Sequence, residues 1–141
     1  LEINKLFPGV TVVQEACPMW VPLVENNEIN TPAADYFVKR HVNNLLSKNA
    51  DIDTIILACT HYPMLIDLIK KSLPVGTRIM DQGPLVADKL KDYLKRHLEI
   101  ESQCAKNAKE EFYTTGSVEL FDHNAETFFG KKISSGHIEL K

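Results

Sequence analysis

A cysteine, a threonine and a histidine follow directly on an apolar run near the middle of the chain. Thr54 to Ala58 are β-branched or apolar, which predicts a strand buried on both faces, as in a parallel sheet. Pro63 suits the first turn of a helix, because its missing N–H is not needed there. Cys59 and His61 are therefore expected at the strand-to-helix corner, at the sheet edge where open α/β proteins bind ligands.

The Cys59 thiol has two interpretations. Free cysteine often packs as a small hydrophobe, and the His61 ring alone is equally well explained by a hydrogen bond to a nearby carbonyl. Cys59, however, ends the apolar run instead of lying inside it, and a helix N-terminus next to it favours the thiolate. Together, Cys59 and His61 indicate a thiol–imidazole acid–base site.

Composition and charge exclude several classes of partner. The 141 residues carry a formal net charge of -3, so no basic surface is expected for nucleic acid or an anionic membrane. No apolar run reaches the roughly 18 residues that span a bilayer, and the first residues lack the form of a signal peptide. The sequence therefore predicts a cytoplasmic protein that binds neither nucleic acid nor a membrane.

The cysteines also bear on metal and disulfide chemistry. Cys17, Cys59 and Cys104 lie far apart and form no Cys-x-x-Cys pair. Cys59 and His61 are ligand types that zinc prefers, and four further histidines are present, but no second pair has recognisable ligand spacing. We therefore expect no metal site and no disulfide framework.

The order of elements predicts an α/β fold with a mostly parallel sheet and flanking helices. Two successive strand–turn–helix units, starting at the strands near 54–58 and 78–81, carry this prediction. The expected strands cover 10–13, 54–58, 78–81 and 112–115, and the expected helices cover 31–48, 63–73, 85–98 and 117–129. Two prolines indicate an apolar loop over 17–25, residues 99–110 are a polar surface excursion, and 131–141 form a strand or tail.

Several motifs resemble the carboxyl-terminal half of glutamate racemases. The motifs are Leu57 to Pro63 (Leu-Ala-Cys-Thr-His-Tyr-Pro), Ala16 to Pro18, Val21 to Glu25, Met80 to Gly83 followed by Val86 and Ala87, and Phe112 to Gly116. The resemblance covers nearly the whole chain. Aspartate racemases of the same superfamily usually carry Glu at the position of His61, so this position favours glutamate as the substrate.

The resemblance implies a cofactor-independent racemase that supplies D-glutamate for peptidoglycan. Such enzymes use two cysteines on opposite faces of glutamate, because one base would return the proton to the face it came from. By this resemblance Cys59 is one of the two bases, His61 activates its thiol, and Glu25 lies near His61. Thr60 would bind a substrate carboxylate. Without the resemblance, Glu25 would be read as an ordinary solvated carboxylate.

The chain departs from the family in one respect. An amino-terminal half with an Asp-Ser loop and an Ala-Cys-Asn-Thr segment carries the second cysteine of a full racemase, and neither motif occurs here. Cys17 matches a structural stretch of the family, and Cys104 lies in the polar segment, as a surface thiol would. The resemblance then implies that residues 1–80 hold most of the second domain and 81–141 complete the first. It also implies that the isolated chain is inactive.

Two alternatives stay open at this point. One is a one-cysteine enzyme of the same superfamily, such as a decarboxylase, that protonates a carbanion on one face only. The other is a non-catalytic α/β module that associates with itself, or with a missing half, through the surface the missing half would cover. Apolar side chains of the expected loop, Met19, Trp20, Val21 and Leu23, suggest such association as a homodimer.

Overall fold

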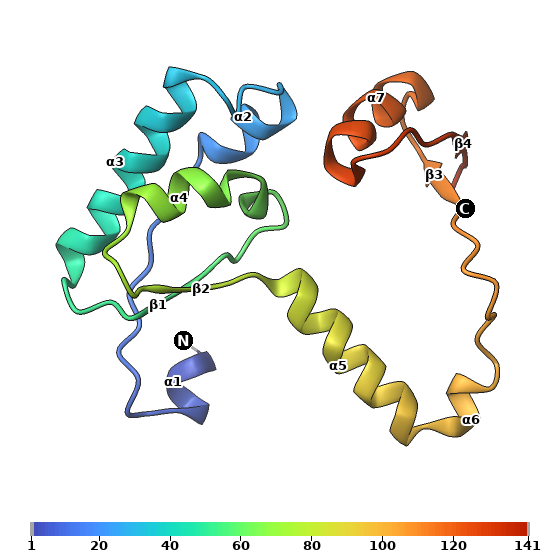
Figure 1. Ribbon diagram of the computed structural model, residues 1–141, viewed down its shortest axis with the longest axis horizontal. Helices are drawn as coiled ribbons and strands as arrows, with labels where there is room; N and C mark the ends of the chain where they lie inside the picture. The colour runs from blue at the N-terminus through green and yellow to red at the C-terminus, as the bar shows by residue number, and fades with distance from the viewer. Residues whose placement is uncertain (1, 141) are drawn as a thin grey trace. The chain divides into compact units, whose positions relative to one another are not determined.

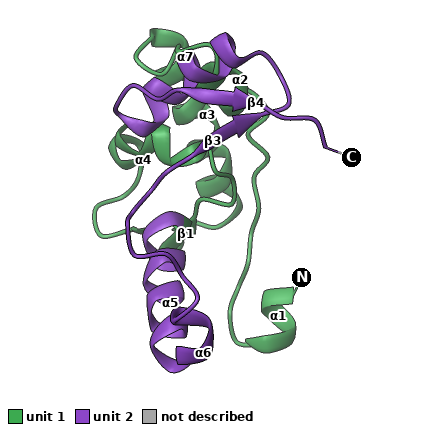
Figure 2. Cartoon of the chain, turned by 90° about the vertical axis from the view of Figure 1, so that its right-hand side faces the viewer, with its two compact units in different colours: residues 1–82 green, residues 83–141 purple. Residues whose placement is uncertain are grey.

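The computed structural model describes residues 2–140 and divides into two compact units (Figures 1 and 2). Unit 1 runs to Gln82 and unit 2 begins at Gly83. Each unit contains one pair of parallel strands with helices around it. An α/β fold with parallel strands is therefore confirmed. The assignment of residues 1–80 and 81–141 to the two domains of a racemase stays a prediction.

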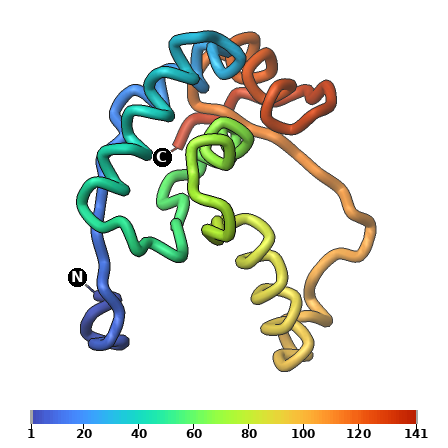
Figure 3. Tube along the Cα trace, turned by 60° about the vertical axis from the view of Figure 1, so that its left-hand side comes forward, coloured from blue at the N-terminus to red at the C-terminus, as the bar shows by residue number. Residues whose placement is uncertain are grey.

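Unit 1 consists of a parallel strand pair and helices that pack on one another. Its elements are α1 (Glu2–Leu6), α2 (Trp20–Glu25), α3 (Pro32–Lys48), β1 (Thr54–Ile56), the 3-10 helix η1 (Tyr62–Leu65), α4 (Ile66–Ser72) and β2 (Arg78–Met80). Ile55 of β1 lies opposite Ile79 of β2. Figures 1 and 3 show α3 and α4 side by side, and α2 packs against both α3 and η1.

The sequence starts and stops α3 as expected. Thr31 is the N-cap, and its hydroxyl accepts a hydrogen bond from the Ala34 N–H at 3.4 Å. Pro32 occupies the first turn, where its missing N–H leaves no carbonyl unpaired. The helix ends at Lys48, whose positive charge in the last turn suits the helix dipole.

The core of unit 1 lies between α2, α3, η1, α4 and the end of β1. Apolar residues that recur every three or four positions on α3, such as Val38 and Val42, face α2 and α4. Its fully or nearly fully buried members are Cys17, Trp20, Leu23, Val24, Ala34, Val38, Val42, Leu57, Leu65 and Ile69. This core fixes where the loop after β1 and the end of α2 lie.

Residues 17–25 correct one expectation about unit 1. They do not form a loop, because α2 begins at Trp20 and its Pro22 falls in the first turn, where backbone N–H groups lack intrahelical partners anyway. Trp20 and Leu23 are buried, whereas Met19 is 38% exposed, so only part of the apolar surface expected here is open to a partner. The expectation of a loop is wrong, and association through this segment stays a prediction.

Two strand predictions also need correction. Val10 to Val13 form no strand, and the segment is extended without a ladder partner among the described residues. β1 covers Thr54 to Ile56 only, and Ile56 is 49% exposed. A strand in a two-stranded sheet is not covered on both faces, so the expected full burial of 54–58 is wrong even though the strand itself and its parallel pairing are confirmed.

Unit 2 contains α5 (Gln82–Arg96), α6 (Leu98–Glu101), β3 (Phe112–Thr114), α7 (Val118–Phe129) and β4 (Ser135–His137). α5 starts three residues earlier than expected, and α6 overlaps the start of the segment expected to be a polar excursion. β3 and β4 pair in parallel, with Tyr113 opposite Gly136. A side chain at Gly136 would meet the Tyr113 ring at 3.3 Å, so glycine fits this register.

α7 carries the capping pattern that its sequence predicts. The Ser117 hydroxyl accepts a hydrogen bond from the Leu120 N–H at 3.2 Å. At the other end Gly130 has a φ of 73°, the left-handed conformation that commonly ends helices at glycine. The Phe129 ring packs edge-on against Phe112 of β3, which joins the helix to the strand pair. Within residues 2–140 no helix is both long and apolar enough to cross a bilayer.

Candidate functional site

The corner after β1 is held in place by backbone pairing that continues past the strand ends. The Leu57 N–H donates to the Met80 carbonyl at 3.1 Å, and the side-chain amide of Gln82 donates to the Leu57 carbonyl at 3.1 Å. Leu57 itself is buried in the core. The chain then turns through Cys59 to His61 into η1, in which Pro63 is the second residue. The expected strand-to-helix corner is present, with a 3-10 turn in place of the first α-helical turn.

Cys59, His61 and Glu25 form a continuous line of contacts at this corner. The Cys59 Sγ lies 3.8 Å from Nδ1 of His61, and Nε2 of the same ring is hydrogen-bonded to Oε1 of Glu25. The His61 side chain is 26% exposed and Glu25 is 46% exposed, so the line is open to solvent. The structure thus brings Glu25 to His61, 36 positions later in the sequence, and to neighbouring Cys59.

This arrangement defines what the ring can do. A carboxylate only accepts hydrogen bonds, so Glu25 favours a proton on Nε2 of His61. In the neutral ring, Nδ1 is then the nitrogen with a lone pair, and it faces the Cys59 thiol. A proton can pass from sulfur to Nδ1, which leaves a thiolate beside an imidazolium. The geometry therefore suits acid–base or nucleophilic work by a thiol.

Glu25 reaches His61 because the preceding residues of α2 are packed in the core of unit 1. Leu23 and Val24 are buried in the core, so the last turn of α2 has a fixed direction. Glu25 is the final residue of that helix, and Asn26 ends it with a backbone hydrogen bond to Pro22. The residue most readily explained as a solvated carboxylate thus lies against the histidine. Its catalytic role stays a prediction.

The other candidate residues, Thr60, Cys17 and Cys104, have different surroundings. Thr60 is exposed at the bend between Cys59 and His61, and its role in binding a carboxylate stays a prediction. Cys17 is buried, its thiol points to the Glu15 carbonyl at 3.8 Å, and burial raises the pKa of that thiol to about 11. Cys104 is exposed in unit 2, where its thiol contacts the Ile100 carbonyl at 3.5 Å.

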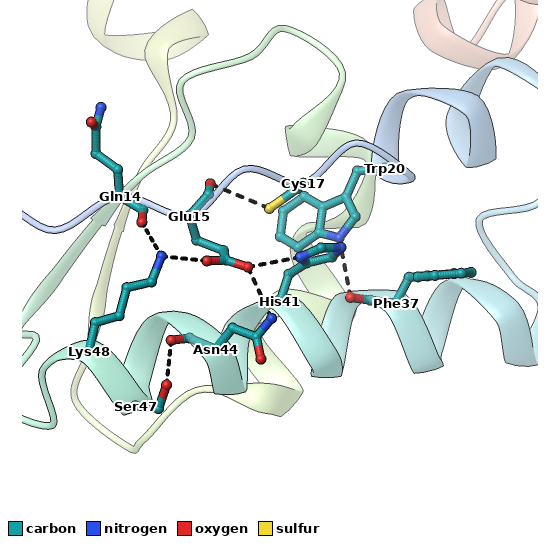
Figure 4. A network of polar contacts seen from close by, with 9 residues as sticks. All are labelled: Gln14, Glu15, Cys17, Trp20, Phe37, His41, Asn44, Ser47 and Lys48. Atoms are coloured by element: carbon teal, nitrogen blue, oxygen red, sulfur yellow. Dashed lines mark hydrogen bonds and ion pairs between the residues drawn. The ribbon is translucent and has the colours of Figure 1, made fainter.

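A second polar cluster in unit 1 was not singled out from the sequence as functional. Glu15, in the extended segment before α2, contacts His41, Asn44 and Lys48 of α3, as Figure 4 shows. Hydrogen bonds from Lys48, His41 and Asn44, in that order of size, lower the pKa of the Glu15 carboxyl to about 2. One signal was available in the sequence, because His41 interrupts the apolar face of α3 and a buried ionisable residue needs a partner.

Metal binding has no support from grouped ligands. Among residues 2–140, no cluster of three or more His, Cys, Asp or Glu side chains is arranged to hold an ion.

Comparisons with known proteins give one consistent match. The chain is 34% identical to the glutamate racemase of Streptococcus thermophilus, over 99% of this chain and 50% of that protein. Its fold superimposes with a TM-score of 0.82 on a glutamate racemase isoform of Bacillus anthracis, with 34% identity over 98% of this chain and 50% of that one. The glutamate racemase of Francisella tularensis, solved in complex with D-glutamate, gives a TM-score of 0.80 at 23% identity, which shows the fold alone.

No protein-family model matches the sequence. The relatives and solved structures named above are nevertheless glutamate racemases, and the chain spans about half of their length. The matching half is the carboxyl-terminal one. The Cys-Thr-His corner lies inside this matched region, since nearly all of the chain is covered. By sequence and by fold, the chain is therefore similar to the carboxyl-terminal half of glutamate racemases.

Proposed function

We propose that this chain supplies one of the two bases of a cofactor-independent glutamate racemase. The observation that carries the proposal is the line from Cys59 through His61 to Glu25, at the carboxyl end of β1, in a chain similar to this family. The relatives of 34–36% identity are named glutamate racemases, which supports glutamate as the ligand class. In a bacterial cell, D-glutamate made in this way would serve peptidoglycan synthesis in the cytoplasm.

Cys59 acts on one face of the substrate. As thiolate, its Sγ takes the α-proton of one enantiomer, and the electron pair of the broken C–H bond passes to the α-carbon and its carboxylate. A base on the opposite face then donates a proton to that carbon, which gives the other enantiomer. In the reverse direction the Cys59 thiol is the donor. His61 holds or returns the thiol proton, and Glu25 keeps the ring oriented.

Thr60 and the turn around it would bind the substrate carboxylate. Thr60 is exposed next to Cys59, so its hydroxyl and backbone N–H are accessible to a ligand at the same corner. A carboxylate held there places the α-carbon within reach of sulfur, as proton transfer requires. The role of Thr60 is thus to orient the substrate while Cys59 carries out the chemistry.

The second base is not supplied by the other thiols of this chain. The Cys17 thiol is buried in the core of unit 1, and its pKa of about 11 keeps it protonated near neutral pH. Cys104 is an exposed thiol at the end of α6. The isolated 141 residues should therefore not racemise glutamate.

The test compares the isolated chain with a chimera that adds the amino-terminal half of the Streptococcus thermophilus racemase. Exchange of the α-hydrogen of L- and D-glutamate is followed by NMR in D2O, and circular dichroism checks folding. We expect exchange by the chimera and by its Cys104→Ser variant, none by its Cys59→Ser variant, and none by the isolated chain. Exchange by the isolated chain or by the Cys59→Ser chimera contradicts the proposal. Decarboxylation of phenylmalonate by the isolated chain would instead favour the one-cysteine alternative.

Association is proposed through α5, since Trp20 and Leu23 of the segment at 19–23 are buried. The apolar side chains Leu85, Val86 and Leu90 of this helix are exposed, and exposed apolar patches often mark contact surfaces. We expect the sedimentation coefficient of the isolated chain to rise with concentration, and Leu90→Glu to abolish this rise. Val75→Glu is the matched control, because Val75 is exposed but lies outside α5. A strictly monomeric wild-type chain contradicts this part of the proposal.

A further inference from the structure

The Glu15 cluster is a partly buried polar network outside the Cys59 site, with His41 buried and Lys48 44% exposed. The carboxylate of Glu15 contacts Nδ1 of His41 at 3.1 Å, accepts a hydrogen bond from Asn44 Nδ2 at 3.1 Å, and pairs with Lys48 Nζ at 2.6 Å (Figure 4). The side chains of His41 and Glu15 are only 10% and 14% exposed. Lys48 also donates to the Gln14 carbonyl, so α3 holds the segment before α2 at two successive residues.

Stability alone is a weak reason for such a network. Removing charges from water costs nearly as much as their attraction returns, and apolar replacements of buried ion pairs are often neutral or stabilising. What these contacts do provide is a fixed position for the Glu15 carboxylate on α3. The segment before α2 has no ladder partner among the described residues, so its side-chain contacts with α3 set its position.

A line of aromatic contacts connects this network to the candidate site. The Trp20 ring meets His41 edge-on, with centroids 6.2 Å apart, and meets Tyr62 edge-on at 4.8 Å. The Trp20 indole N–H donates to the Phe37 carbonyl at 3.4 Å, which fixes the ring on α3. Tyr62 directly follows His61 in the chain, and Trp20 opens the helix that ends in Glu25.

Trp20 is therefore linked to both partners of the His61–Glu25 hydrogen bond. Its ring packs on Tyr62, the residue after His61, and Trp20 begins the helix whose last residue is Glu25. Its own position depends on His41, and the position of the His41 ring depends on Glu15. All of these contacts lie within unit 1.

We propose that Glu15 and His41 are positioning residues for the Cys59 site, which act through Trp20 to hold Glu25 on His61. The inference rests on the proposed role of Cys59 and His61 in proton transfer. Neither Glu15 nor His41 touches the substrate. They keep the His61 ring turned with Nδ1 toward the sulfur.

The test uses the isolated chain with Cys104→Ser as background, because Cys104 is the exposed thiol that would otherwise react. Two signals are measured at pH 7.5, the ring signals of His61 in long-range 1H–15N spectra and the rate of Cys59 alkylation by iodoacetamide. Glu25→Gln defines the change expected when the hydrogen bond to His61 is altered directly. We expect Glu15→Ala to shift the His61 signals toward those of Glu25→Gln and to slow alkylation by about threefold, since thiolate is the reactive form.

Two further variants separate positioning from simple loss of stability. Glu15→Gln retains an acceptor for His41 and should restore at least half of both changes. Ile69→Val shortens a fully buried side chain of the same core and should lower the melting temperature without moving either signal. A folded Glu15→Ala chain with wild-type His61 signals overturns the inference. If Glu15→Ala does not fold, His41→Gln takes its place, with the same expected shift and the same overturning result.

The outcome is independent of racemisation. An inactive chimera together with altered His61 signals in Glu15→Ala would remove the proposed function and leave the structural coupling in place. An active chimera with unaltered signals would do the reverse.

Discussion

Units 1 and 2 differ in how they bury apolar side chains. Among the described residues, every buried apolar side chain belongs to unit 1, and these side chains lie between Cys17 and Ile69. Unit 2 has well-capped helices and a parallel strand pair, but its large apolar residues remain partly or fully exposed. Local signals are therefore sufficient to form helices in unit 2, whereas the geometry of a site depends on the core that only unit 1 has.

The largest expected difference between the units is in core truncation. Leu65 is 1% exposed and Leu90 of α5 is 56% exposed. Leu65→Ala should lower the free energy of unfolding by about 2–5 kcal/mol, because it leaves a cavity in addition to the lost burial. Leu90→Ala, the matched control, should change it by less than about 0.5 kcal/mol. Urea unfolding followed by circular dichroism measures both, and equal losses would refute the contrast.

Thiol reactivity distinguishes the units next. Cys17 of unit 1 is buried with a pKa of about 11, so little thiolate is present at pH 8, whereas Cys104 of unit 2 is exposed. We expect iodoacetamide to modify Cys17 at least about a hundredfold more slowly than Cys104. Peptide mass spectrometry over time gives both rates. In 6 M urea the two rates should converge, and rates that already agree in the folded chain would show that Cys17 is accessible.

The pH dependence of unit 1 should follow Glu15. The pKa of its carboxyl is about 2 in the folded chain against 4.5 for the free group, so the unfolded chain binds more protons between these values. The stability that Glu15 provides is therefore present above pH 4.5 and is lost as the pH falls toward 2.

Glu15→Gln should cost about 1–2 kcal/mol at pH 7 and much less at pH 3, after allowance for the partial exposure of Lys48. Urea midpoints at the two pH values measure this difference. Glu28→Gln, which changes an exposed carboxylate of the same unit, is the control and should give the wild-type difference. If the stability of Glu15→Gln depended on pH as that of the wild type does, groups other than Glu15 would cause the loss of stability in acid.

The smallest expected effects come from the helix caps. Thr31→Ala and Ser117→Ala each remove a side-chain acceptor for a first-turn N–H and should cost about 1 kcal/mol. Because unit 1 has a packed core, Thr31→Ala should lower the stability of the whole unit. In unit 2, Ser117→Ala should destabilise α7 alone. Amide hydrogen exchange resolves the difference. Protection lost equally far from α7 in Ser117→Ala would show that unit 2 is as cooperative as unit 1.

Sequence patterns were most reliable where one local signal was sufficient. The Thr31–Pro32 start of α3, the Ser117 cap of α7 and the corner after β1 are confirmed. The patterns failed at Val10 to Val13, where β-branched residues have no partner strand among residues 2–140. They also failed at Pro22, where an apparent helix breaker lies at a helix start.

The sequence by itself determined the parallel strand pair and the placement of Cys59 and His61 at its end, because each depends on neighbouring residues and their spacing. The resemblance to glutamate racemases placed Glu25 near His61. Only the tertiary structure decided that Glu25 contacts Nε2 of the ring, across 36 positions, and that Glu15 pairs with His41 across 26. Nothing local distinguishes these carboxylates from solvated ones. Their partners are set by how α2 packs on α3, and that packing is a property of the whole core.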